Sequence, residues 1–73
     1  MTPAQCRAAR ALLGIPRPEL ARASGVPKDM IADFEAGVRR PGELYLRAIE
    51  QALERAGVEF IDEIGVKLSA GKR

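Results

Sequence analysis

Glycine and proline divide the first 57 residues of the chain into four runs with a helix-like pattern of apolar and polar positions. In the last run, Leu46, Ile49 and Leu53 recur at helical spacing, and Gly57 follows as a stop. The approximate limits of the four predicted helices are Pro3 to Leu13, Arg17 or Pro18 to Ser24, Lys28 to Ala36, and Glu43 to Ala56. We therefore expect a mostly α-helical fold.

Short motifs mark the ends of two of these helices. Thr2 is suited to cap the first helix, Pro3 fits its first position, and Gln5 stands where a capping box requires Glu or Gln. Gly14 ends this helix, and Gly37 ends the third because glycine accepts a left-handed backbone conformation.

The period of the pattern changes after the fourth helix. In residues 58–61 and 65–68 the pattern of apolar and polar positions is that of two short strands. Residues 62–64 are expected to form the turn between them. The expected domain organisation is a helical domain at 1–57, a β-hairpin or strand pair at 58–69, and a frayed tail at 70–73.

An isolated two-stranded hairpin is marginally stable in water, so the strand pair needs a partner surface. Phe60, Val66 and Leu68 can pack on the fourth helix of the same chain, or an exposed strand edge can pair with its copy in a second chain. Of the two we favour a homodimer, since a single domain of this size offers few contacts to a partner. The candidate dimerisation residues are Val58, Phe60, Val66 and Leu68.

Composition and charge exclude several classes of function. The chain has no histidine and a single cysteine, Cys6, so the commonest general base, an internal disulfide and a cysteine-rich zinc site are all excluded. Cys6 is expected to be a buried structural thiol, and neither an enzyme nor a cofactor is indicated. No apolar run approaches the roughly 20 residues that span a bilayer, and no signal peptide is recognisable, so we expect a cytosolic protein without a membrane partner.

Positive charge is concentrated in the first part of the chain. Residues 1–47 carry eight Lys or Arg and five Asp or Glu, whereas residues 48–73 carry four and five. The net charge of +2 therefore comes from the first three helices and the loop after them. This distribution favours an anionic partner for that region.

The break between the second and third runs is typical of a helix-turn-helix. Gly25 supplies the positive φ that the turn needs, and Ala21 is small enough for the second helix to cross closely. The apolar residues expected to hold the pair on the core are Leu20, Val26, Ile31 and Phe34. The helix-turn-helix is expected at about 17–36, with the second of its helices presented outward.

In four stretches the sequence resembles the Cro and phage-repressor (xenobiotic-response-element-like) family of helix-turn-helix proteins. The stretches are "ARALLG", "ELARASGV", "IADFEAGVRRP" and "LRAIEQALERAG", in the order and spacing of that family. The resemblance covers residues 4–57 and implies a lambda-repressor-like domain. It also implies an ion pair between Arg10 on the first helix and Glu35 late in the third.

Members of that family are mostly sequence-specific regulators of transcription, often dimeric repressors, whose third helix enters the major groove of double-stranded DNA. The resemblance thus implies the same function here, with phosphate contacts from Arg17, Arg39 and Arg40. The outward positions that can read bases are Lys28, Asp29, Ala32 and Asp33. Lys28 can reach guanine, a carboxylate can accept from cytosine N4, and Ala32 can touch a thymine methyl.

Two departures from the family pattern leave a second hypothesis open. Pro27 stands where a serine or threonine normally caps the recognition helix, and Asp29 and Asp33 are repelled by a groove lined with phosphates. In this second hypothesis the fold serves a regulator that binds a protein through the third-helix face, such as an anti-activator or antitoxin, with weak or no DNA binding.

Overall fold

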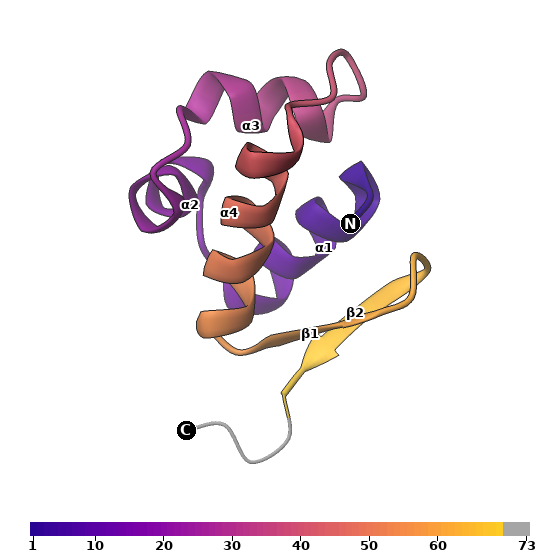
Figure 1. Ribbon diagram of the computed structural model, residues 1–73. Helices are drawn as coiled ribbons and strands as arrows, with labels where there is room; N and C mark the ends of the chain where they lie inside the picture. The colour runs from indigo at the N-terminus through magenta and orange to yellow at the C-terminus, as the bar shows by residue number, and fades with distance from the viewer. Residues whose placement is uncertain (70–73) are drawn as a thin grey trace.

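The computed structural model describes residues 1–69 and contains four helices followed by a two-stranded antiparallel sheet (Figure 1). The elements are α1 (Pro3–Leu13), α2 (Arg17–Ser24), α3 (Lys28–Glu35), α4 (Glu43–Arg55), β1 (Val58–Ile61) and β2 (Gly65–Leu68). The predicted fold class, mostly α with a C-terminal strand pair, is confirmed. The expectation of a frayed tail at 70–73 lies outside the described residues.

The capping box at the start of α1 forms as the sequence predicts. The backbone N–H of Gln5 donates to Thr2 Oγ1 at 3.1 Å, and the N–H of Thr2 donates to Gln5 Oε1 at 2.9 Å. At the other end Gly14 adopts φ 69°, and the N–H of Ile15 donates a hydrogen bond to the carbonyl of Arg10. Both ends of α1 are therefore set by local hydrogen bonds.

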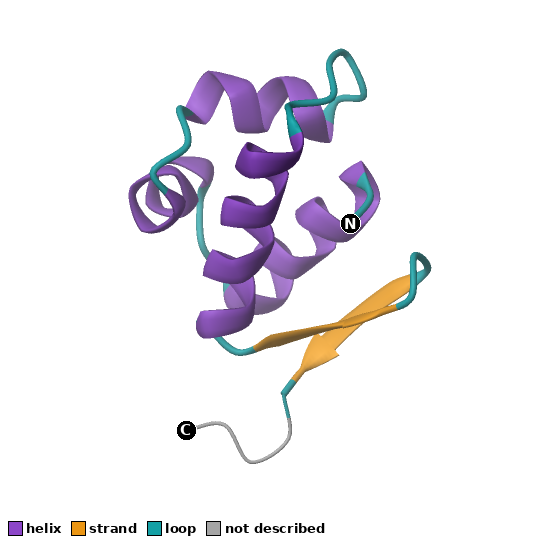
Figure 2. Cartoon of the chain, in the orientation of Figure 1, coloured by secondary structure: helices purple, strands orange, loops and turns teal. Residues whose placement is uncertain are grey.

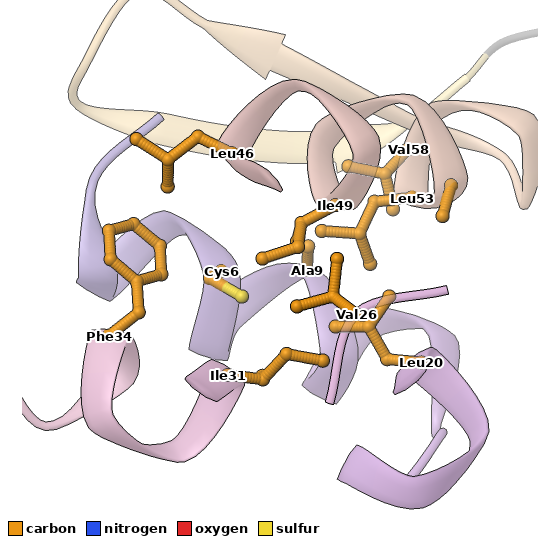
Figure 3. Packing of buried hydrophobic residues seen from close by; sticks show 11 residues of the cluster. Cys6, Ala9, Leu20, Val26, Ile31, Phe34, Leu46, Ile49, Leu53 and Val58 are labelled. Carbon is orange, nitrogen blue, oxygen red and sulfur yellow. The ribbon is translucent and has the colours of Figure 1, made fainter. Parts of the chain in front are cut away.

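A single apolar core lies between the helices (Figure 3). Its buried side chains come from every helix, from the turn between α2 and α3 and from β1: Cys6, Ala9, Leu20, Val26, Ile31, Phe34, Leu46, Ile49, Ala52, Leu53 and Val58. The four residues predicted to hold the helix-turn-helix on the core are all among them. α4 packs on α2 and α1 (Figure 2), and α3 in turn packs on α2 and α1, so the inward stripe of α4 holds these helices on one core.

The hairpin uses one face to pack on its own chain. Val58 pairs with Leu68 and Phe60 with Val66, so these four side chains share a face, and that face lies on α1 and α4. Val58 is 2% exposed, and Phe60 and Val66 are partly buried against the core. Among these four residues Leu68 is the exposed one, at 55%, because it lies beyond the area that packs on α1 and α4.

The position of Val58 corrects its predicted role in dimerisation. A side chain in the core of its own chain has no surface to offer a second copy, because the contact is already made with α1 and α4. The opposite face of the hairpin carries Glu59 and Lys67, whose charged groups lie 3.6 Å apart, together with Ile61. Contacts with another chain are left to the strand edges and the tip of the hairpin.

Candidate nucleic-acid interface

The turn between α2 and α3 is built by hydrogen bonds within residues 20–26. Gly25 adopts φ 76°, and its N–H donates to the carbonyl of Ala21 at 2.8 Å. Ser24 Oγ donates to the carbonyl of Leu20 at 2.8 Å and accepts from the N–H of Val26 at 3.2 Å. These bonds complete the end of α2, because its last backbone groups gain partners where the helix stops.

The third helix begins without a side-chain cap. Pro27 occupies the N-cap position, and its carbonyl accepts from the N–H groups of Met30 and Ile31 at 3.1 and 3.2 Å. Since proline offers no side-chain oxygen, the first-turn N–H groups of α3 lack the usual intramolecular acceptor.

The outward surface of α3 is uncovered. In Figure 1 this helix lies along the upper edge of the molecule, with the other helices on one side of it only. Lys28, Asp29 and Ala36 are exposed, and Ala32 and Asp33 are half-buried. The structure therefore brings the four predicted base-reading positions together on one side of one helix.

The loop after α3 is folded back onto the end of that helix. Gly37 adopts φ 76° and donates to the carbonyl of Phe34 at 3.0 Å, while Val38 donates to the carbonyl of Asp33 at 2.9 Å. This pair of bonds is a Schellman motif. The N–H of Arg39 also points to the carbonyl of Asp33, at 3.3 Å, so the start of the loop has a fixed position.

Both arginines of this loop lie exposed beside the end of α3. The guanidinium carbon of Arg40 is 5.9 Å from the centre of the Phe34 ring, within the range of a cation–π contact. Arg39 is held through its backbone and leaves its side chain in solvent. The two predicted phosphate-binding residues therefore carry their charges at one end of the outward surface.

Glu35 is the centre of a buried polar cluster that joins three helices. Arg10 of α1 donates to it twice, from Nε to Oε2 and from Nη2 to Oε1, both at 2.8 Å. Arg17, at the start of α2, donates from Nε to Oε1 at 2.8 Å, and Cys6 Sγ donates to Oε2 at 3.1 Å. The Glu35 side chain is 0% exposed, so the carboxylate is fully surrounded by these donors.

The cluster shifts the pKa of its members. Burial alone raises the pKa of Glu35, but hydrogen bonds from Arg10, Cys6 and Arg17 outweigh it and hold that pKa below its usual range. The hydrogen bond with Glu35 raises the pKa of Arg10. Burial, and then the neighbouring carboxylate, raise the pKa of the Cys6 thiol, so the thiol stays protonated and serves as a donor.

Sequence reasoning missed two arginine contacts in this region. It assigned Arg17 to DNA phosphate alone, whereas the structure also pairs Arg17 with Glu35. It gave no role to Arg7, whose Nη1 donates to the backbone carbonyl of Glu35. No local spacing in the sequence signals these contacts, because Arg7 and Arg17 lie on other helices than Glu35 and meet it only in the folded protein.

Comparison with known proteins agrees with this geometry. Residues 7–60 match the family model described as helix-turn-helix, of the Cro/C1 type, whose members are DNA-binding regulators. A search of curated proteins found no match. None of the helices within residues 1–69 has the length and apolar character needed to cross a membrane.

Proposed function

Because the chain belongs to the Cro/C1-type helix-turn-helix family, we propose that it is a sequence-specific DNA-binding regulator of transcription that acts as a repressor. One observation carries the proposal beyond the family. Arg39 and Arg40 lie exposed beside the last turn of α3, and Arg17, which contacts Glu35 in that turn, is 42% exposed. They border a side of α3 on which no other helix of residues 1–69 packs. A basic border beside an outward helix suits the major groove, where phosphates flank the base edges.

In this binding mode α3 enters the major groove and arginines at its end grip the backbone. Arg17, Arg39 and Arg40 contact phosphates, which fixes the register of the helix on the duplex. Lys28 is the one cation among the outward positions of α3 and reads guanine O6 and N7. The small Ala32 allows close approach to a thymine methyl, and Asp29 or Asp33 accepts from cytosine N4.

The repressor acts as a homodimer in this proposal. Two copies joined by a two-fold axis place two α3 helices on successive major grooves, and the operator is then a palindrome. The hairpin supports a role in pairing, since its strand edges are free of other strands within residues 1–69 and three apolar side chains, Ile61, Ile64 and Leu68, are exposed on it.

The decisive experiment measures binding of the full chain to duplex DNA from upstream of its own gene. Fluorescence anisotropy at several salt concentrations gives both the affinity and the salt slope. Replacing Arg39 or Arg40 with Gln should lower affinity for every sequence and reduce the slope by about one unit. Arg55→Gln removes the same charge at the last residue of α4, together with an exposed hydrogen bond to the carbonyl of Ala23, and serves as the control. A wild type without affinity above background at low salt would refute the proposal.

A second function is favoured by the two carboxylates on the reading face. Asp29 and Asp33 stand on the outward side of α3, where they oppose an approaching phosphate backbone. A regulator that binds a basic protein surface through the same face would use them as attractive groups. This function predicts that Asn at either position weakens a protein complex, while the arginine substitutions have little effect.

A further inference from the structure

The Arg17 guanidinium is engaged on one side only. Its Nε donates to Glu35 Oε1 at 2.8 Å, yet within residues 1–69 neither terminal nitrogen forms a hydrogen bond. The side chain is 42% exposed, whereas its partner carboxylate is 0% exposed. One edge of the guanidinium therefore lies against the buried cluster, and the nitrogens that bind phosphate most readily are free.

Charge balance inside the cluster does not require Arg17. Arg10 already forms a two-point contact with Glu35 and is 17% exposed, so one guanidinium neutralises the one carboxylate. Arg17 adds a second positive charge to the same carboxylate and leaves the cluster with an excess of +1. That excess lies at the start of α2, on the side where the backbone of a bound duplex is expected.

We propose that Glu35 is a positioning residue for DNA-backbone binding: its carboxylate holds Nε of Arg17 so that the terminal nitrogens of the same guanidinium face a phosphate. The inference rests on the proposed function and names one more residue for it. An arginine already fixed at Nε loses less freedom on binding than a free surface arginine does. Glu35 thus takes part both in the internal ion pair with Arg10 and in placing Arg17 against a DNA phosphate.

Positioning and simple electrostatics predict opposite results for Glu35→Gln. Removal of a negative charge should, by electrostatics alone, strengthen the attraction of the protein for DNA. If the carboxylate positions Arg17, the same change releases the guanidinium, and binding becomes weaker. A role limited to stability leaves the salt slope of the folded protein unchanged.

Arg17→Lys provides a second, independent test. Lysine keeps the positive charge but has a single nitrogen, and a nitrogen held at Glu35 cannot also take the place of the outer guanidinium nitrogens. If Arg17 is only a point charge near a phosphate, lysine should replace it. If it is shared between carboxylate and phosphate, lysine should behave as Arg17→Gln does.

The experiment compares Glu35→Gln, Arg17→Lys and Arg17→Gln with the wild type, using upstream duplex DNA between about 50 and 200 mM salt. Circular dichroism first establishes that each variant is folded. We expect each to lower the salt slope by about one unit and the affinity at about 0.1 M salt by roughly 5- to 10-fold. Arg55→Gln, on the last turn of α4, should retain the wild-type slope.

Two results would overturn the inference while leaving the proposed function intact. One is a folded Glu35→Gln that binds DNA as tightly as the wild type or more tightly. The other is Arg17→Lys with the full wild-type slope, and this result decides alone if Glu35→Gln does not fold. Absence of DNA binding by the wild type is a different outcome, because it refutes the proposed function itself.

Discussion

Gln5 Nε2 donates a 3.0 Å hydrogen bond to the backbone carbonyl of Gly65, a residue 60 positions later in the chain. The same nitrogen donates to the carbonyl of Asp62, also at 3.0 Å. Since Gln5 Oε1 accepts from the N–H of Thr2, one buried side chain completes the cap of α1 and holds the hairpin turn against that helix. The hairpin is thus anchored at its turn as well as at Val58.

Loss of this amide should destabilise the whole domain. Gln5→Ala leaves two hairpin carbonyls and one helix N–H without a side-chain partner, and we expect a loss of about 1–3 kcal/mol in the free energy of unfolding. Gln5→Glu keeps the acceptor for Thr2 but replaces the donor with a buried carboxylate that faces two carbonyl oxygens, so it should destabilise the domain at least as much. Urea unfolding measures both, with exposed Gln51→Ala as the control. A Gln5→Ala variant within about 0.5 kcal/mol of wild type would contradict this account.

The two halves of this contact differ in how far sequence predicts them. Thr2 and Gln5 stand three residues apart, so the capping box follows from local spacing alone. The bonds from Gln5 to Asp62 and Gly65 depend on how the hairpin lies on α1, and no local pattern specifies that. The helix limits were predictable for the same reason as the cap, because Gly14 and similar stops act on their immediate neighbours.

Removal of one member of the Arg10–Glu35 pair should destabilise the fold more than it weakens DNA binding by the protein that remains folded. Each single change leaves a buried charge without its main partner, which costs about 3–5 kcal/mol. The comparison pair is Glu43 and Arg47, one turn apart on α4, whose charged groups are exposed and 4.0 Å apart. Alanine at either of these should cost less than about 1 kcal/mol. If urea unfolding places Arg10→Ala and Glu35→Ala within about 0.5 kcal/mol of wild type, the pair behaves as a surface contact.

The low pKa of Glu35 makes its contribution to stability depend on pH. Because the folded protein holds this pKa below the value of the unfolded chain, the contribution is complete above the unfolded pKa of about 4.3 and is lost as pH falls toward the folded value. The difference in unfolding free energy between wild type and Glu35→Gln should therefore stay constant from about pH 7 to 5 and shrink below about pH 4. Exposed Glu54→Gln corrects for the general change in charge. A difference that stays constant to pH 3 would contradict the assignment.

The candidate site shows the same limit of sequence reasoning. Arg10 and Glu35 could be paired in advance because the resemblance supplied both positions. The contacts of Arg17 and Cys6 with Glu35 could not, since they join helices that meet only in the folded protein. For Val58, the strand pattern gave the apolar side of the hairpin but not whether that side packs on helices of the same chain or on a second copy.

The dimer proposal can be tested at the tip of the hairpin. Ile64 is 85% exposed, so Ile64→Lys should leave folding nearly unchanged while weakening self-association by at least roughly tenfold, because it places a charge in the contact. Leu44 is 80% exposed on α4, and Leu44→Lys is the matched control. Truncation after Gly57 is a less selective test, because it also removes Val58 from the core. Sedimentation of a wild type that is monomeric at high micromolar concentration would refute the dimer.

The reading face itself is tested by changing one cation and one carboxylate of α3. Lys28→Ala should relax the preference at a single base pair, at a cost of roughly 1–3 kcal/mol if Lys28 binds guanine at two points. Asp33→Asn should tighten non-specific binding, because it removes a carboxylate that the phosphates repel. Anisotropy with the upstream duplex and with single-base variants of it separates the two effects. Val38→Ala, in the exposed loop after α3, is the uncharged control.

The direction in which Asp33→Asn changes binding affinity decides between the two functions. In a DNA reader the half-buried carboxylate opposes the partner, so its neutralisation raises affinity for the duplex and leaves the salt slope nearly the same. In a regulator that binds a basic protein, the same carboxylate attracts the partner, so Asp29→Asn and Asp33→Asn each weaken the complex, most strongly at low salt. Tighter DNA binding by Asp33→Asn together with relaxed base preference in Lys28→Ala is the result expected here. Lys28→Ala with an unchanged preference at every base pair would mean that α3 does not read the sequence through this residue.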